Sequence, residues 1–403
     1  MASVAAALGY LVGMVVLVAM ALGSHRVGLL AGAPLLAAAR AVGDVVRAYA
    51  AEGETLRRLP TPTMEALRDA GLLRMAVPAA YGGPEADPLT MLSCMEAVAQ
   101  ADGAAGWCSM IATTTASLAM FLPPEWADPI FRDPLTVTGG VFAPNGRATG
   151  DGDHWSVDGR WQWGSGTQHC QWIVGGVMAD DGTQHVMFFP AADVTFHDTW
   201  HTHGLRGTGS LDFSVDGARV PKGRSVVPAS GARYVDSPLA AFPNFTLLAI
   251  GVAAVALGIG RRAIDEIVAL GVDKRPQFSQ RTIAQMGTNQ SDLARAEGRL
   301  SAARAYLFDE VGRAWQAVLA GDHVDVAARA RMRLAGAHAA ESAAAVVDAC
   351  YTMAGGTAVY ESSALQRCLR DVHVATQHIM VAPRLYETMG KHLFGLPIES
   401  SMI

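Results

Sequence analysis

The spacing of apolar positions changes twice along the chain. Between residues 34 and 131, apolar side chains recur every three or four positions, which is typical of helices that bury one face. Between residues 134 and 228 the period falls to two, and turn residues such as Asp158–Gly159 separate the apolar stretches. From about residue 240 the helical period returns and continues to the end. The pattern predicts an α–β–α order.

This pattern divides the chain into four expected segments. They are an apolar N-terminal segment over 1–31, a helical domain over 32–133, a β-domain over 134–235 and a C-terminal helical-bundle domain over 236–403. Helices are expected over 35–59, 60–71, on both sides of Asp102–Gly103 within 87–122, and over 245–272, 282–321, 324–356 and 365–395. Strands are expected over 155–163, 172–179, 185–190, 193–200 and 210–221. The stretch 245–272 is apolar on most sides, which predicts a buried helix.

The first 24 residues contain no Asp, Glu, Lys or Arg. Their apolar run is long enough to cross a bilayer, which takes about 20 residues, but it lacks the basic start of a secretory signal. Three interpretations stay open. The segment is a membrane anchor that brings residues 1–24 into contact with a bilayer, an extension upstream of a folded protein that begins near Gly32, or a buried helix or export signal.

Composition narrows the functional classes. The 403 residues are 51% hydrophobic and 17% charged, which excludes a disordered chain. A net charge of −6 argues against nucleic-acid binding, which needs a basic surface. The five cysteines are widely spaced and include no CxxC, so neither a disulfide framework nor a metal site is expected. The expected location is a reducing compartment, the cytoplasm. Walker A, HExxH and GxSxG motifs are missing from the sequence, which removes the NTPase and common hydrolase readings.

Three separated motifs carry a family resemblance. GLRGTGSLDFSVDGARVP (204–221), MAGGTAVYESSALQRCLRD (353–371) and KRPQF (274–278) resemble motifs of the acyl-CoA dehydrogenase superfamily, in the same order. The resemblance implies an α+β fold with an N-terminal helical domain, a central β-barrel or sandwich domain and a C-terminal four-helix bundle. Further segments, GRWQWGSGTQHCQWI (159–173) and LRDVHVATQHI (369–379), resemble one branch, the oxygenase components of two-component flavin-dependent monooxygenases.

The missing acids favour that branch. A dehydrogenase of this superfamily needs a carboxylate base against the flavin. In the stretch after Arg370–Asp371 the first acid is Glu387, and NFTLLAIG (244–251) contains none. Three functions therefore stay open: a monooxygenase, an acyl-CoA dehydrogenase with a displaced base such as Glu387, and a non-catalytic, flavin-free paralogue.

The monooxygenase resemblance implies partners and site residues. The expected cofactor is reduced FMN, or FAD, from a separate flavin reductase. With O2 it would form a C4a-hydroperoxyflavin that hydroxylates an aromatic or heterocyclic small molecule, in a homotetramer. Catalytic roles are expected for His378 and for Ser165, near flavin N5. Flavin binding is expected for Trp163, Ser165, Gly166, Arg206, Thr208, Gly209, Ser210, Arg275 and Gln285, and Trp107 and His169 are expected in the substrate pocket.

Each of these residues also has a plain structural reading. His378 could be a satisfied core histidine, Ser165 a β-turn serine, and Arg275 a solvated charge at a helix end. Six of the eight tryptophans lie between residues 126 and 200, either as a platform for a flat ligand or as packing between β layers. If the helix over 365–395 is continuous, Asp371 and His378 share a face, and Asp371 is expected to pair with an arginine.

Overall fold

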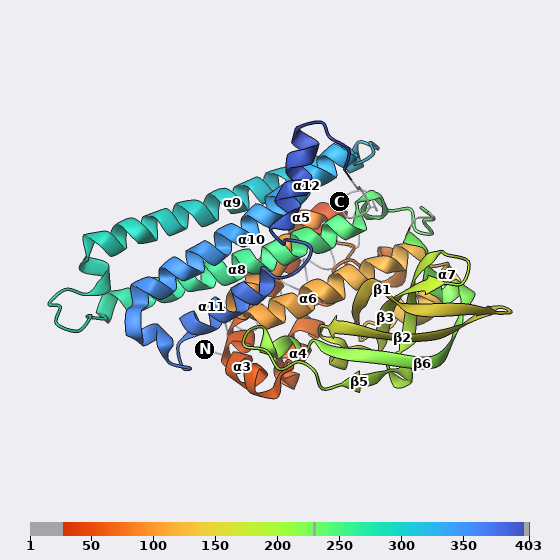
Figure 1. The fold of residues 1–403 in the computed structure, drawn as a ribbon, viewed down its shortest axis with the longest axis horizontal. Helices are drawn as coiled ribbons and strands as arrows, with labels where there is room; N and C mark the ends of the chain where they lie inside the picture. Colours follow the sequence, from red (N-terminus) through yellow and green to blue (C-terminus); the bar gives the residue numbers. More distant parts are fainter. Residues whose placement is uncertain (1–26, 229–230, 399–402) are drawn as a thin grey trace, which may run out of the picture.

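The computed structural model of the chain describes residues 27–228, 231–398 and 403. Hypotheses about residues 1–24 therefore lie outside the described residues. The α–β–α order is confirmed: long helices form one side of the molecule and the sheet forms the other (Figure 1).

The N-terminal part is helical. Its helices are α2 Val27–Ala41, α3 Gly43–Leu56, α4 Thr61–Asp69, α5 Pro88–Ala101, α6 Gly103–Ala116 and α7 Pro124–Phe131. Capping sets the boundary between the two central helices, because the Asp102 carboxylate accepts the amide hydrogen of Ala105 and so begins α6. In the same way Asp87 accepts from Thr90 at the start of α5. The expected separation at Asp102–Gly103 is confirmed.

The β-domain is a single seven-stranded mixed sheet in the order β5-β6-β2-β1-β3-β4-β7. The strands are β1 Thr138–Asp151, β2 His154–Gly164, β3 Trp172–Ala179, β4 Gln184–Pro190, β5 Thr195–His197, β6 Leu211–Pro221 and β7 Ser225–Val226. Strand β1 pairs antiparallel with β2 and parallel with β3, and its register shifts between Val141 and Gly146. The sequence pattern did not predict β1, whose glycines and proline interrupt the alternation.

Two tryptophans on β2, Trp161 and Trp163, differ in whether their rings are packed in the interior or exposed as a surface for a ligand. Trp161 is fully buried, stacks on Phe213 with ring centroids 5.1 Å apart and donates its Nε1 hydrogen to Gly176 O. Gly146 and Gly175 leave room for this ring, because a Cβ at either would lie 2.5–2.7 Å from it. Trp163, two residues further along, has a left-handed backbone conformation and is 68% exposed. Packing explains Trp161, and an exposed ring surface stays available at Trp163.

The C-terminal helices are α8 Asn244–Asp273, α9 Gly287–Leu319, α10 Val326–Ala354, α11 Ala364–Ala375 and α12 Arg384–Leu393. Helices α8, α9 and α10 run side by side, α5 and α6 both pack against α8, and α6 also contacts the sheet at β1 (Figure 1). Helix α8 is long and apolar enough to span a membrane, but 89% of its most apolar window is buried inside the protein. Its expected burial is confirmed.

The expected continuous helix over 365–395 is wrong. Helix α11 ends at Ala375 and α12 begins at Arg384, after Pro383. A proline lacks the amide hydrogen that a continuing helix would use, and it restricts the residue before it. His378 therefore lies in the turn between two helices, and its position is set by that turn.

Candidate functional site

The first group of predicted residues meets where the end of β2 packs against α6. Ser165 follows β2 directly and is 5% exposed. Its hydroxyl accepts the Trp107 indole hydrogen at 3.1 Å, and Trp107 comes from the first half of α6. Gly166, with φ +70°, donates its amide hydrogen to Thr208 O at 2.8 Å. The segment around Ser165 is thus held between α6 and the segment that precedes β6.

A line of hydroxyl groups extends from Ser165. Ser165 Oγ lies 2.6 Å from Ser210 Oγ, and Ser210 Oγ lies 2.6 Å from Thr208 Oγ1. Thr208 belongs to a short 3-10 turn, Arg206–Thr208, and donates its hydroxyl hydrogen to Leu205 O at 2.8 Å. The amide hydrogens of Thr208 and Gly209 are also used within this turn. The predicted Thr208 and Ser210 thus lie together in the interior, with their side chains directed toward Ser165.

Helix α11 contacts the segment around Gly204 and Leu205 and holds it in place. Asp371 is 4% exposed and accepts the Leu205 amide hydrogen at 2.6 Å. The expected pairing of Asp371 with an arginine is wrong for the described residues: the neighbouring arginines of α11, Arg367 and Arg370, both pair with Glu54 on α3, at 3.1 and 2.6 Å. The backbones approach so closely that a Cβ at Gly204 would overlap the Arg370 carbonyl oxygen, so glycine is required there.

Burial makes Asp371 a weak acid. It raises the pKa of Asp371 to about 7, with the nearby carboxylate of Asp102 as the second cause. Asp102 is buried too, and its pKa is raised to about 6 for the same reason. At neutral pH this carboxylate pair is therefore close to its titration range.

His378 lies beside the Ser165 group. Its ring meets that of Trp107 edge-on, with centroids 5.5 Å apart. The Met380 amide donates to His378 Nδ1 at 3.3 Å, which places the ring hydrogen of the neutral form on Nε2. Burial first, and then the charge of Arg333, lowers the pKa of His378 to about 4. The imidazole is consequently neutral at pH 7.

Arg333, on α10, was not predicted from the sequence. It is completely buried and donates to Met380 O at 3.1 Å, so it supports the turn that carries His378. A signal was available, since Arg333 occupies a position that faces inward in an otherwise Ala-rich helical pattern.

Three features around Ser165 fit a flat ring with a polar edge. Trp163 presents its exposed ring from a left-handed backbone conformation, φ +65°, which is rare for a bulky residue and is associated with functional sites. His169 Nε2 and Arg206 Nε are buried without a hydrogen-bond partner in the described part of the chain. Burial, followed by the charge of Arg58, lowers the pKa of His169 to about 4, so it is neutral. These orphaned atoms are suited to a polar ligand.

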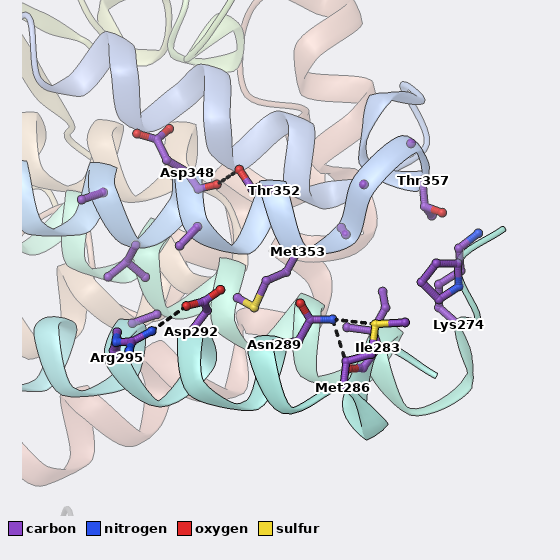
Figure 2. A pocket seen from close by; sticks show the side chains of 18 of the residues that line it. Lys274, Ile283, Met286, Asn289, Asp292, Arg295, Asp348, Thr352, Met353 and Thr357 are labelled. Atoms are coloured by element: carbon purple, nitrogen blue, oxygen red, sulfur yellow. Dashed lines mark hydrogen bonds and ion pairs between the residues drawn. The ribbon is translucent and has the colours of Figure 1, made fainter. Parts of the chain in front are cut away.

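A second candidate region lies far from this group. A hollow of about 1120 Å³ opens between α9, α10 and the loop that joins α8 to α9. Figure 2 shows Asp292 on α9 and Met353 on α10 directed toward the space between the two helices, whereas the Asp348 carboxylate points away from α9 and pairs with His373 at 2.8 Å. Its lining also includes Lys274, the first residue of the KRPQF motif, together with Arg299 and the Gly355–Gly356 pair, which the sequence analysis did not assign to a site. Arg295 pairs with Asp292 at 2.9 Å, so Lys274 and Arg299 are the basic side chains that fit an anionic group.

The predicted phosphate residues lie at the edge of this hollow. Arg275 is exposed and adjacent to the lining residue Lys274. Gln285 forms a capping box with Thr282, whose amide hydrogen it accepts at 2.9 Å. This T-x-x-Q signature was readable in the sequence. The α8–α9 loop lies at the far end of the helical layer from the sheet, so a single chain does not bring it to Ser165 (Figure 1).

The chain is similar to known proteins along most of its length. Residues 35–123 match the acyl-CoA dehydrogenase N-terminal domain and residues 250–383 match the acyl-CoA dehydrogenase C-terminal domain. An indole-3-acetate monooxygenase from Pseudomonas putida is 32% identical, with 87% of this chain and 90% of that protein covered. The oxygenase subunit of a flavin-dependent monooxygenase from Rhodococcus jostii is 30% identical, with 89% and 97% covered.

Solved structures agree with these relatives. A 3-HSA hydroxylase from a Rhodococcus species superposes with a TM-score of 0.86 at 28% identity, covering 92% of this chain and 99% of that one. XiaF from a Streptomyces species, in complex with FADH2 and glycerol, gives 0.85 at 26% identity, with 91% and 96% covered. Together, the fold and the relatives show that this chain belongs to the flavin-dependent monooxygenase oxygenase components of the acyl-CoA dehydrogenase superfamily.

Proposed function

We propose that this chain is the oxygenase component of a two-component system that hydroxylates an aromatic or heterocyclic small molecule. Relatives named indole-3-acetate monooxygenase and p-hydroxyphenylacetate 3-hydroxylase, oxygenase component, support an aromatic substrate. The observation that carries the proposal is the meeting of Trp107, Ser165 and His378 around one buried point. A separate reductase would supply reduced FMN or FAD.

The residues around Ser165 fit the flavin ring, and bound reduced flavin would supply the electrons that activate O2. In our proposal Trp163 and Gly166 lie against the ring, and the Ser165 hydroxyl meets its N5 edge. Arg206, with its orphaned Nε, would bind a polar edge of the ring. Gly209 would let the backbone approach, since its φ of +53° suits glycine. His169 and Trp107 would border the substrate.

His378 would act as a hydrogen-bond donor. Its Nδ1 already accepts from Met380, and its pKa near 4 keeps the ring uncharged. A neutral imidazole with hydrogen on Nε2 can donate to a developing oxygen anion without a change of protonation. This assigns His378 a narrower role than a general acid or base.

The displaced-base dehydrogenase is less well supported. Glu387 lies on α12 with its side chain 71% exposed, and it pairs with Lys391 at 2.6 Å. Lys391 lowers the pKa of Glu387. A solvated, paired carboxylate is a poor base for removing a carbon-bound proton in a dry site. The buried acid Asp371 uses its carboxylate to accept the Leu205 amide hydrogen.

The α9–α10 hollow suggests how the flavin phosphate is held. We propose that Lys274, Arg275, Arg299 and the loop up to Gln285 bind the phosphate end of a flavin whose ring lies in a second copy, within a homotetramer. The separation of the hollow from Ser165 supports contact across copies. Phe278 supports it too, because this apolar side chain is 98% exposed on the same loop. Light scattering of the purified chain, with four copies expected, tests the assembly.

The reaction is tested with the full chain, reduced FMN and 18O2, over a panel that includes indole-3-acetate and p-hydroxyphenylacetate. The expected result is a product that contains one 18O atom, formed only when the flavin is supplied reduced. Oxidised FMN serves as the matched control. Bleaching of protein-bound oxidised flavin by an acyl-CoA would contradict the proposal and favour the dehydrogenase. Failure to bind either flavin form would favour the non-catalytic paralogue.

A further inference from the structure

The hydroxyl groups of Thr208, Ser210 and Ser165 form a chain whose direction can be worked out. All three residues are buried, at 2%, 3% and 5% exposure. Each hydroxyl carries one hydrogen and two lone pairs. The two ends of the chain are fixed groups. At one end is the Leu205 carbonyl, which can only accept, and at the other is the Trp107 indole N–H, which can only donate.

The carbonyl end sets the direction. Thr208 Oγ1 lies 2.8 Å from Leu205 O, so the threonine hydrogen must lie between them. Leu205 O also accepts from the Thr208 amide and the Trp200 indole, each at 3.1 Å, so the hydroxyl contact is the shortest of the three. If the Thr208 hydrogen pointed the other way, two oxygens would face each other at 2.8 Å with no hydrogen between them.

The remaining hydrogens follow in order. The Thr208 hydroxyl hydrogen is donated to Leu205 O, so Ser210 must donate to Thr208 across their 2.6 Å contact. The Ser210 hydroxyl hydrogen is then donated to Thr208, so Ser165 must donate to Ser210, again across 2.6 Å. Ser165 also accepts from Trp107. Its oxygen is left with one unused lone pair and no hydrogen to offer.

We propose that Thr208 and Ser210 are positioning residues that make Ser165 an acceptor, so that the site selects a flavin that carries hydrogen on N5. This rests on the proposed function, in which Ser165 meets flavin N5. Reduced flavin has an N5–H, which can donate to the Ser165 lone pair. Oxidised flavin has a lone pair on N5, which would face the lone pair of Ser165. The selectivity is thereby built into Thr208 and Ser210, which the sequence predicts as flavin-binding residues and which here act through Ser165.

Thr208→Val tests this directly. Valine keeps the shape of threonine and removes the hydroxyl, so Ser210 and Ser165 can reverse and Ser165 can donate to oxidised N5. Thr208→Ser is the matched control, because it keeps a hydroxyl beside Leu205 O. The measured quantity is the ratio of the dissociation constants of oxidised and reduced FMN, from anaerobic titrations at equilibrium. We expect the wild type and Thr208→Ser to prefer reduced FMN, and Thr208→Val to lose about tenfold of that preference, the scale of one hydrogen bond.

The possible outcomes distinguish failure of the hydroxyl-chain proposal from failure of the proposed function. An unchanged ratio in a folded Thr208→Val that still binds flavin would overturn the role of the hydroxyl chain and leave the proposed function intact. Loss of both flavin forms by the wild type would instead overturn the proposed function. If Thr208→Val does not fold, as judged by circular dichroism, Ser210→Ala gives the same test, because it also frees the Ser165 hydrogen. A Ser210→Ala ratio equal to that of the wild type would then contradict the inference.

Discussion

The Ser165 group and the α9–α10 hollow use their polar atoms in opposite ways. Around Ser165 the hydroxyl groups of Ser165, Ser210 and Thr208 are buried, uncharged and bonded to one another, and His378 is kept uncharged. The hollow is open and charged, with Lys274, Arg295 and Arg299 among its lining residues. A buried, bonded network fixes hydrogen positions. An open basic surface attracts an anion but directs no single proton. The difference suggests that chemistry is controlled at one end of the flavin and affinity at the other.

The sharpest test of this division is His378→Ala. A donor held toward a developing oxygen anion is worth about 100-fold or more in rate. We expect product formation to fall by about that factor while reduced FMN still binds, with the oxygen recovered as hydrogen peroxide. The wild-type rate should also show no titration of His378 between pH 5.5 and 8, since its pKa lies near 4.

His323→Ala is the matched control for that experiment. This histidine is exposed in the turn between α9 and α10, so its removal should leave product formation within about twofold. An equal loss in both variants would point to general damage. An unchanged rate in His378→Ala would contradict a catalytic role for this histidine and weaken the distinction between the two regions.

The hollow is tested by removing its charge. Lys274→Ala combined with Arg275→Ala should weaken FMN binding by about tenfold, because each charge-assisted contact to a phosphate is worth more than about 1 kcal/mol. Riboflavin lacks the phosphate, so its affinity should not change. The comparison of FMN with riboflavin in one variant separates lost charge from lost structure. Arg313→Ala, which removes an exposed arginine of α9 outside this loop and outside the lining of the hollow, is the control. Equal weakening of both flavins would contradict a phosphate site.

Trp107 contacts both Ser165 and His378. Substitution of Trp107 should have a smaller effect than the changes above. Trp107→Phe keeps an aromatic ring against His378 and removes only the indole hydrogen that Ser165 accepts at 3.1 Å. Loss of one buried neutral hydrogen bond costs about 1 kcal/mol, so reduced FMN should bind about fivefold more weakly. Fluorescence titration under anaerobic conditions measures this. Trp315→Phe, on α9, controls for the loss of a tryptophan elsewhere.

Local sequence signals predicted the elements better than the site. The burial of α8 and the break at Asp102 follow from apolar period and capping, which act over a few residues. The site depends on partners that are distant in sequence. Ser165 meets Trp107 over a separation of 58 residues and Ser210 over 45, and only the folded chain brings them together. A pattern of neighbours along the chain carries no record of such contacts.

Two local features limited the prediction in other ways. The alternation that predicts strands is interrupted in β1 at Gly139, Gly140, Pro144 and Gly146, where the strand shifts register and makes room for Trp161. In the C-terminal segment the apolar period continued past a break that Pro383 marks, so His378 was placed on a helix. In the first case tertiary packing outweighs the pattern, and in the second a proline does.

The smallest predicted effect concerns the carboxylate pair behind the Leu205 segment. The pKa of Asp371 is raised by burial first, by Asp102 second and then by Glu54, against the Leu205 amide and Arg370, which lower it. In the unfolded chain this carboxyl titrates near 3.8, and in the folded protein near 7. The folded state therefore holds more protons in this range, and stability falls as pH rises from 4 towards 7.

Asp371→Asn keeps an oxygen for the Leu205 amide and removes the charge. Its melting temperature should fall a few degrees less than that of the wild type between pH 5.5 and 8. His378 and His169, whose lowered pKa values act in the opposite direction below pH 6.5, are unchanged between the two proteins, so the difference reports the carboxylate pair of Asp371 and Asp102. Identical slopes would show that Asp371 does not titrate between pH 5.5 and 8, and would contradict the raised pKa of this carboxyl.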